Sequence, residues 1–155
     1  GAERQDSVRC GLDALPADAE CVLIHDGARA LVTEDVIRRA IKSVEKRGSG
    51  IASVPVTDTI KRAAPDGLVL DTPDRSALRA MQTPQAFRVE LIRKAHDIAR
   101  RDGFLGTDDA ALLEHAGMPV YLCEGSRENL KLTTPTDLML AGLILAARAE
   151  KELIG

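Results

Sequence analysis

The feature that most constrains the fold is an apolar run, an amphipathic helix and a second apolar run, which follow one another early in the chain. Residues 21–25 are apolar, partly β-branched and followed by an Asp-Gly pair, which is typical of a buried parallel strand. Residues 36–44 repeat apolar side chains at helical spacing behind Thr33, a predicted cap, and Gly48 is placed to end that helix. Residues 51–56 predict a second strand, so the three segments predict a βαβ unit with a right-handed crossover.

The segment after this unit predicts a hairpin. Residues 57–62 and 68–72 flank the turn sequence Ala-Pro-Asp-Gly, and the first limb is more polar than a core strand. We expect this arm, at about residues 57–74, to project from the sheet and to serve in dimerisation.

The second half of the chain returns to alternating elements. It predicts a helix from near Arg88 to Arg101, a helix capped by Thr107, a strand at residues 119–124 and a last helix that opens at Thr134. The predicted fold class is α/β, with a mostly parallel, Rossmann-like twisted sheet and the hairpin arm, in a single domain over residues 1–155.

Composition excludes several classes of protein. With 155 residues, 45% hydrophobic and 29% charged, the chain can bury a core as one globular domain. Only 2% of the residues are aromatic, none is Trp, and the net charge is −3, so neither stacked bases nor a basic face for nucleic acid is expected. Recognition of phosphate must therefore depend on a few placed cations.

The cysteines and the apolar runs indicate a compartment. The chain has an odd number of cysteines, Cys10, Cys21 and Cys123, and no two of them have CxxC spacing. We therefore expect reduced thiols rather than a disulfide framework or a zinc site. No apolar run reaches the ~20 residues of a membrane span, and no signal-peptide pattern is visible, so a cytoplasmic location is expected.

Polar residues gather where the predicted strands end, and ligands bind at such ends in open α/β sheets. Asp26 follows the first strand and can hold Mg²⁺ through its carboxylate. Gly27 allows a ligand close to the backbone, and Arg29 can bind a phosphate through two hydrogen bonds. An Asp that caps a turn and a solvated Arg are the alternative interpretation.

A second group of polar residues lies further along the chain. Lys131 stands just before the last helix and can neutralise charge on a reacting phosphate. Taken alone, a solvated lysine is the simpler interpretation. The same holds for Arg75, which lies in a loop, and for Thr107, whose capping role needs no substrate.

Taken together, seven segments of the chain resemble the methylerythritol phosphate cytidylyltransferases. Each motif alone is weak, but the seven occur in the order of that family and span nearly the whole chain. They are residues 3–8 (ERQDSV), 25–29 (HDGAR), 55–61 (PVTDTIK), 74–76 (DRS), 82–87 (QTPQAF), 107–110 (TDDA) and 129–135 (NLKLTTP).

The resemblance implies a nucleotidyl transfer in isoprenoid precursor synthesis by the non-mevalonate route. The phosphate of 2-C-methyl-D-erythritol 4-phosphate would attack CTP, and pyrophosphate would leave. The resemblance implies that Asp26 holds Mg²⁺ and that Arg75 and Lys131 are catalytic. Because the nucleophile is already an anion, the reaction needs alignment and charge neutralisation rather than a strong general base.

The resemblance also implies binding residues and a partner. The sugar phosphate would be bound by Arg29, Thr59, Thr83, Thr107 and Lys131, and the cytidine with its ribose by Gly1, Ser7 and Gly27. Thr59 and Arg75 belong to the arm side, which in the family reaches into the partner subunit's site, so a homodimer is implied.

The chain departs from the family's pattern in three places. Ala30 stands where a Pro is usual, and Arg79 stands where a bulky aromatic is common. Family members begin with a strand and a glycine-rich loop that cradles the triphosphate, and no such segment precedes Gly1. We therefore expect an N-terminally incomplete domain with an open sheet edge, and negligible turnover from these 155 residues alone.

Two alternatives stay open. A ribitol-5-phosphate cytidylyltransferase would share the fold and the reaction, although residues 74–76 followed by 81–84 resemble the methylerythritol enzymes more closely. The second alternative is a non-catalytic fragment that keeps the arm for dimerisation. The retained set of Asp26, Arg29 and Lys131 argues against it, because a scaffold has no use for these residues.

Overall fold

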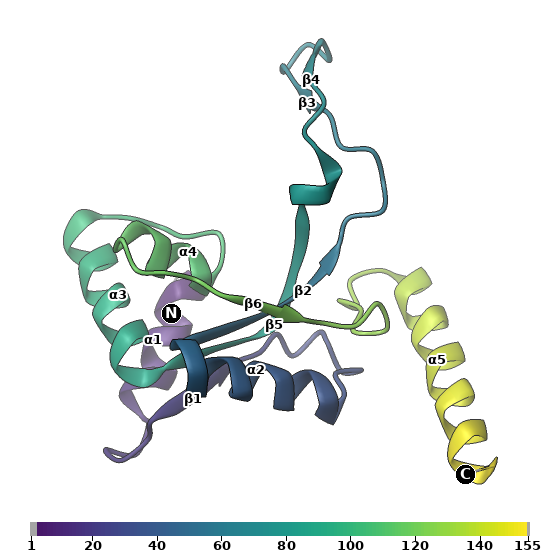
Figure 1. Ribbon diagram of the computed structural model, residues 1–155, viewed down its shortest axis with the longest axis horizontal. Coiled ribbons are helices and arrows are strands. Elements are labelled where there is room, and N and C mark those ends of the chain that lie inside the picture. Colours follow the sequence, from purple (N-terminus) through teal and green to yellow (C-terminus); the bar gives the residue numbers. More distant parts are fainter. Residues whose placement is uncertain (1–2, 155) are drawn as a thin grey trace.

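The computed structural model describes residues 3–154, with side chains described as far as Lys151. Helices lie against a central sheet, a hairpin projects away from it, and the last helix lies at the opposite side from α3 and α4 (Figure 1). The helices are α1 (Arg4–Asp13), α2 (Glu34–Arg47), α3 (Val89–Asp102), α4 (Asp109–His115) and α5 (Pro135–Ile154). The strands are β1 (Cys21–Ile24), β2 (Ser49–Pro55), β3 (Arg62–Ala63), β4 (Val69–Asp71), β5 (Arg79–Arg88) and β6 (Leu122–Glu124), and η1 (Arg75–Ala77) is a short 3₁₀ helix.

The main sheet has the order β1-β5-β2-β6. Strands β1 and β2 each pair antiparallel with β5, and β2 pairs parallel with β6. Three of the four strands therefore run in one direction and β5 runs against them, which confirms the predicted α/β class. The predicted strand–helix–strand unit is present as β1, α2 and β2, with β5 inserted between its two strands.

Alternating side chains of the sheet build two apolar layers. Ala86 of β5 packs with Ala40 and Val44 of α2 on one face. Phe87, the next residue, packs on the other face with residues of α1, α3 and α4 such as Leu12 and Ile92. This alternation is the period-2 pattern of a strand that is covered on both faces.

The ends of α2 follow the prediction closely. Thr33 occupies the N-cap position in an extended conformation, although its side chain makes no capping hydrogen bond. Gly48 ends the helix with φ of 87°, a left-handed conformation that favours glycine. Gly50, at the start of β2, faces the helix so closely that an added Cβ would lie 2.3 Å from the carbonyl oxygen of Ala40.

Two elements and one cap differ from the prediction. Helix α1 and strand β5 were not predicted, because α1 is mostly polar and β5 carries polar residues and a proline in its buried stretch. The cap of α4 is Asp108 rather than Thr107, because the Asp108 carboxylate accepts a hydrogen bond from the Ala111 N–H at 2.9 Å. The helix predicted from near Arg88 to Arg101 is confirmed as α3, and the helix predicted to open at Thr134 is confirmed as α5.

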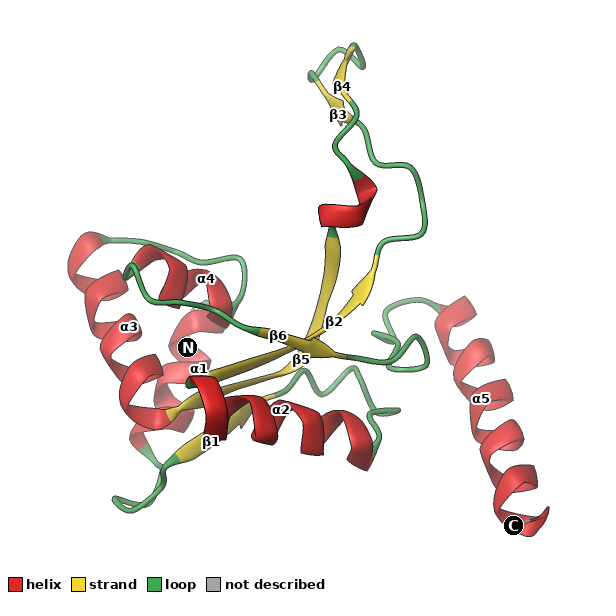
Figure 2. Cartoon of the chain, viewed as in Figure 1, coloured by secondary structure: helices red, strands yellow, loops and turns green. Residues whose placement is uncertain are grey.

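A hairpin is present where it was predicted and projects from the sheet (Figure 2), but residues 57–61 of its predicted first limb form no strand. Its tip is the two-stranded sheet of β3 and β4, and both strands are exposed along their whole length. At its base, the Arg75 guanidinium donates a hydrogen bond to the Thr57 carbonyl oxygen at 2.6 Å. The arm is therefore held mainly by bonds within itself.

Strands β1 and β6 are the two edges of the main sheet over the described residues. Helix α5 exposes several large apolar side chains, among them Leu138, Met139 and Leu143. In the described part of the chain, no helix combines the length and the apolar character needed to cross a membrane.

Candidate functional site

The candidate site is a carboxylate that faces three cations. Asp26 lies in the loop after β1, and its side chain is 18% exposed. The Lys131 Nζ lies 3.1 Å from its Oδ2, the Arg29 Nε 3.8 Å from the same oxygen, and the Arg4 Nη2 3.7 Å from its Oδ1. The structure therefore brings together three residues that the sequence placed at strand ends, Asp26, Arg29 and Lys131.

A chain of hydrogen bonds fixes the Asp26 loop to β5. The Asp26 N–H donates to the Thr83 Oγ1 at 3.0 Å, and the Thr83 hydroxyl in turn donates to the His25 Nδ1 at 3.0 Å. The His25 Nε2 donates to the Arg29 carbonyl oxygen at 3.1 Å. Because that carbonyl can only accept, the network assigns the proton of His25 to Nε2. Thr83, only 5% exposed, thus uses its hydroxyl to hold the loop.

Arg29 and Lys131 are placed by contacts between two loops. The Arg29 Nη1 donates to the Asn129 carbonyl oxygen at 2.7 Å, and the Leu132 N–H donates to the Ala28 carbonyl oxygen at 2.7 Å. Asn129 is fully buried and anchors its loop to β5 through the Thr83 carbonyl oxygen at 2.8 Å. Burial lowers the pKa of Arg29 from its ordinary value, and the Asp26 carboxylate opposes that shift.

A cavity of about 350 Å³ opens beside this cluster. Arg29, Arg127 and Lys131 line it, and no carboxylate does, so the cavity is suited to an anionic small molecule. Its other walls come from β2, β5 and the loop before Lys131.

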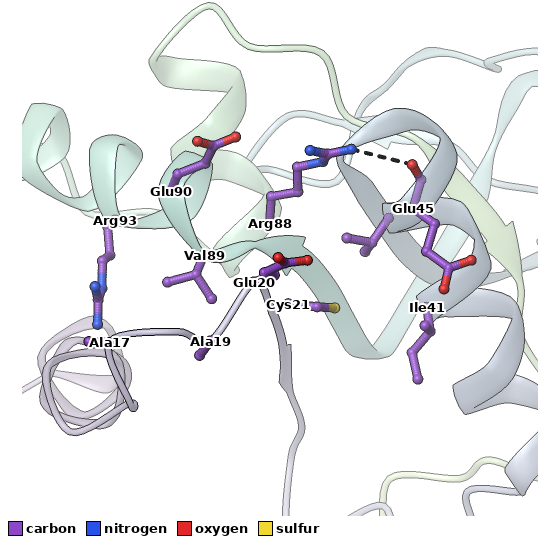
Figure 3. Close-up of a pocket in the computed structure, with 11 residues that line it drawn as sticks. Ala17, Ala19, Glu20, Cys21, Ile41, Glu45, Arg88, Val89, Glu90 and Arg93 are labelled. Carbon is purple, nitrogen blue, oxygen red and sulfur yellow. Dashed lines mark hydrogen bonds between the residues drawn. The ribbon is translucent and has the colours of Figure 1, made fainter.

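A larger cavity, of about 720 Å³, lies where β1 begins, at the other end of that strand from Asp26 (Figure 3). Its lining mixes both signs of charge, with Glu20, Glu45 and Glu90 near Arg88 and Arg93. It contains none of the predicted site residues. Its larger volume alone is therefore no reason to choose it, instead of the cationic cavity, as the candidate site.

The remaining predicted residues lie apart from the cluster or at its rim. Thr59 and Arg75 are on the arm side, and both are exposed. Thr107 is exposed in the loop before α4, and Gly27 is exposed in the Asp26 loop. Ser7 is exposed on α1, where its hydroxyl donates to the Glu3 carbonyl oxygen at 3.4 Å. Gly1 lies outside the described residues.

The cluster also contains two residues to which the sequence patterns assign no role. The Arg4 Nη2 lies 2.7 Å from the Asp109 Oδ2, and Asp109 is buried. Both residues fall inside the motifs at 3–8 and 107–110, so their positions were visible in the sequence. Their pairing was not, because it joins residues 105 positions apart.

The donor set at Asp26 fits Mg²⁺ in one specific way. Among the described residues, no group of three or more His, Cys, Asp or Glu side chains gathers as a metal site. Mg²⁺ is commonly bound by one or two carboxylates together with substrate phosphates and waters. A single carboxylate beside a cavity for an anion suits that mode of binding.

Comparison with known proteins identifies the family. The family model described as "IspD: 2-C-methyl-D-erythritol 4-phosphate cytidylyltransferase" matches residues 1–147. The chain belongs to this family. The match runs through all of the elements that carry the candidate site, from α1 to the start of α5.

Curated members of the cytidylyltransferase family are similar over nearly the whole chain. The 2-C-methyl-D-erythritol 4-phosphate cytidylyltransferase of Caldanaerobacter subterraneus subsp. tengcongensis is 52% identical over 94% of the chain and 64% of its own length. That of Thermosynechococcus vestitus is 52% identical over 98% of the chain and 65% of its own length. The chain therefore spans just under two thirds of the length of these relatives.

Solved structures of the family share the fold. The enzyme from Thermus thermophilus aligns with a TM-score of 0.84 at 37% identity, over 94% of this chain and 71% of that one. The 4-diphosphocytidyl-2C-methyl-D-erythritol synthase from Anaerococcus prevotii aligns with a TM-score of 0.88 at 32% identity, over 94% and 68%. These matches confirm the Rossmann-like α/β fold predicted for this member of the family.

Proposed function

We propose that the protein transfers a cytidylyl group from CTP to 2-C-methyl-D-erythritol 4-phosphate and releases pyrophosphate. The observation that carries the proposal is the Asp26 carboxylate with Lys131 at 3.1 Å, beside a cavity lined by cations. Family membership supports the choice of substrates, because relatives named for this reaction are about half identical to the chain.

The chemistry needs one bond to form and one to break. A phosphate oxygen of the sugar phosphate attacks the α-phosphorus of CTP, and the bond from that phosphorus to the bridging oxygen of the β-phosphate breaks. The electron pair leaves with pyrophosphate. The attacking oxygen is already an anion, so positioning and neutralisation of charge supply the catalysis.

Arg29 and Lys131 are the residues proposed to hold the attacking phosphate. Both line the cationic cavity, and Arg29 is fixed by its bond to the Asn129 carbonyl oxygen. The Lys131 side chain is 51% exposed and has the freedom to turn from Asp26 toward a bound anion. A cation held at the phosphate lowers its repulsion from the triphosphate of CTP.

Asp26 is the residue proposed to hold Mg²⁺. When bound, Mg²⁺ would neutralise negative charge on the phosphates of the two substrates. The chain's own part is to keep the Asp26 loop in place, which the hydrogen bonds through Thr83 and His25 do.

A homodimer through the arm is part of the proposal. The arm exposes Leu68, Val69 and Leu70, which are each more than half exposed and are suited to burial against a second copy. In that arrangement Thr59 and Arg75 would serve the partner subunit's site, with Arg75 at its phosphate. Thr83, Thr107, Ser7, Gly27 and Gly1 stay predicted ligands, and the cytoplasmic location stays a prediction.

The proposal is tested by pyrophosphate release, measured on this chain and on any longer form of the protein. We expect release from the longer form that requires both CTP and 2-C-methyl-D-erythritol 4-phosphate. In that form, Asp26→Asn should lower the rate about 100-fold or more. Asp18→Asn is the matched control, since Asp18 is exposed in the loop before β1. No release from any folded form, or faster release with ribitol 5-phosphate, would overturn the proposal.

A further inference from the structure

A buried carboxylate lies behind the Asp26 cluster. Asp109, in the first turn of α4, is 1% exposed, and its Oδ2 lies 2.7 Å from the Arg4 Nη2. A buried carboxylate without a partner is costly, so the contact with the Arg4 guanidinium compensates the burial of Asp109. The hydrogen bond to Asp109 raises the pKa of Arg4, which keeps the guanidinium charged.

The same nitrogen of Arg4 also faces Asp26. It lies 3.7 Å from the Asp26 Oδ1, whereas Lys131 and Arg29 both approach Oδ2. Lys131 and Arg29 line the cationic cavity, and Arg4 does not. When a bound anion attracts the exposed Lys131 away from Asp26, Arg4 stays beside Asp26, because Asp109 anchors it.

Two glutamines hold the Arg4–Asp109 pair at its ends. On the α4 side, the Gln85 Nε2 donates to the Asp108 Oδ2 at 2.8 Å, and its Oε1 accepts from the Ala110 N–H at 3.0 Å. On the α1 side, the Gln5 Nε2 donates to the Phe104 carbonyl oxygen at 3.2 Å. The backbone on both sides of the pair is therefore fixed to neighbouring elements.

We propose that Arg4, anchored by the buried Asp109, is a positioning residue that fixes the orientation of the Asp26 carboxylate. The inference rests on the proposed function only where it predicts a rate. The structural part of the inference concerns Asp26 alone. The Asp26 Oδ1 keeps its direction because it faces a guanidinium that Asp109 holds in place.

The test uses the double variant Arg4→Met/Asp109→Asn. Removing Arg4 alone leaves a buried carboxylate unpaired and can unfold the protein, whereas the double variant leaves no buried charge. We expect the double variant to fold, with a melting temperature lowered by a few degrees because the buried amide loses its partner. In the form of the protein that shows cytidylyl transfer, we expect kcat to fall by about 10- to 100-fold, with KM for CTP little changed. Arg9→Met, on the same helix, is the matched control and should keep the wild-type kcat.

A crystal structure of the double variant gives a readout that does not depend on activity. We expect the Asp26 carboxylate to turn from its wild-type orientation or to occupy two conformers. A folded double variant with wild-type kcat, or with Asp26 unmoved, overturns the inference. If the wild type shows no cytidylyl transfer, the proposed function fails, and the orientation of Asp26 still decides whether Arg4 positions it.

Discussion

At the residue scale, buried polar side chains of β5 hold the loops of the candidate site. Thr83 bonds the Asp26 loop, and the Gln82 side chain both donates to and accepts from the backbone of Ser126, at 2.8 Å and 3.2 Å. Gln85 holds the first turn of α4. Such residues are predictable as motifs from the sequence, but their partners are not, because each bond joins segments that meet only in the folded chain.

The bond network around Thr83 predicts the effect of Thr83→Val, which keeps the shape of the side chain and removes its hydroxyl. The Asp26 N–H and the His25 Nδ1 would each lose their partner, so we expect a loss of about 1–3 kcal/mol in the free energy of unfolding. The control is Thr33→Val, because the Thr33 side chain makes no capping bond, and it should cost about 0.5 kcal/mol or less. Urea unfolding of both variants measures the difference, and equal losses would contradict the assigned role of Thr83.

His96 predicts a pH dependence of stability. It is 2% exposed and its Nε2 has no partner, and burial lowers its pKa below the ordinary value of 6.5. As pH falls below that value, the unfolded chain gains a proton that the folded chain resists, so stability should decrease. The decrease in stability should end once the pH is below the pKa of His96 in the folded protein. Thermal melts of His96→Leu should lack the decrease in stability that His96 causes as the pH falls. If the pH profile of the melting temperature is the same as in the wild type, His96 is not its source.

At the element scale, amphipathic helices and apolar strands were predictable and polar elements were not. Helices α2 and α3 show clear apolar stripes, and β1 and β2 are apolar runs. Strand β5 was missed because five of its ten residues are Arg, Gln or Thr, although Ala86 and Phe87 pack in the two apolar layers. Helix α1 has one fully buried residue, Leu12, which leaves almost no apolar period to detect.

The contact between α2 and β2 predicts that Gly50→Ala is strongly destabilising. The new methyl group would lie 2.3 Å from the Ala40 carbonyl oxygen and 2.8 Å from the Ser43 Cβ, and the helix backbone cannot yield without loss of packing. We expect a loss of about 3 kcal/mol in the free energy of unfolding. In Gly142→Ala, on α5, an added Cβ meets nothing within 4 Å, and this control should be neutral or slightly stabilising. A Gly50→Ala variant as stable as the control would show that the contact is looser than the structure indicates.

At the scale of the whole molecule, the arm is the part whose proposed role depends on a second copy. Its leucines at the tip are about as exposed as Leu105, which lies in a loop outside the arm. We expect Leu68→Ser/Leu70→Ser to weaken the dimer about tenfold or more, since each change removes apolar area from the proposed interface. Leu105→Ser should leave it unchanged. Analytical ultracentrifugation measures both, and a dimer equally tight in both variants would contradict an interface at the arm.

The sequence predicted the class of the whole fold and the centre of the candidate site. The cluster of Asp26, Arg29 and Lys131 was predictable, because strand ends meet at one edge of the sheet. The Arg4–Asp109 pair behind the cluster was not predictable, because Arg4 lies on α1, a helix that the sequence patterns did not predict. The roles proposed for the arm-side residues Thr59 and Arg75 require a second subunit, and the contacts within one chain do not predict them.

Calorimetric titration of the protein with 2-C-methyl-D-erythritol 4-phosphate decides whether the cluster of Asp26, Arg29 and Lys131 binds this substrate. We expect binding to the wild type and to Lys94→Met, whose lysine is exposed on α3, and binding at least about tenfold weaker to Lys131→Met. Ribitol 5-phosphate should bind more weakly than the methylerythritol compound. Equal binding by the two lysine variants, or tighter binding of ribitol 5-phosphate, would contradict the claim that Asp26, Arg29 and Lys131 form the site for this substrate.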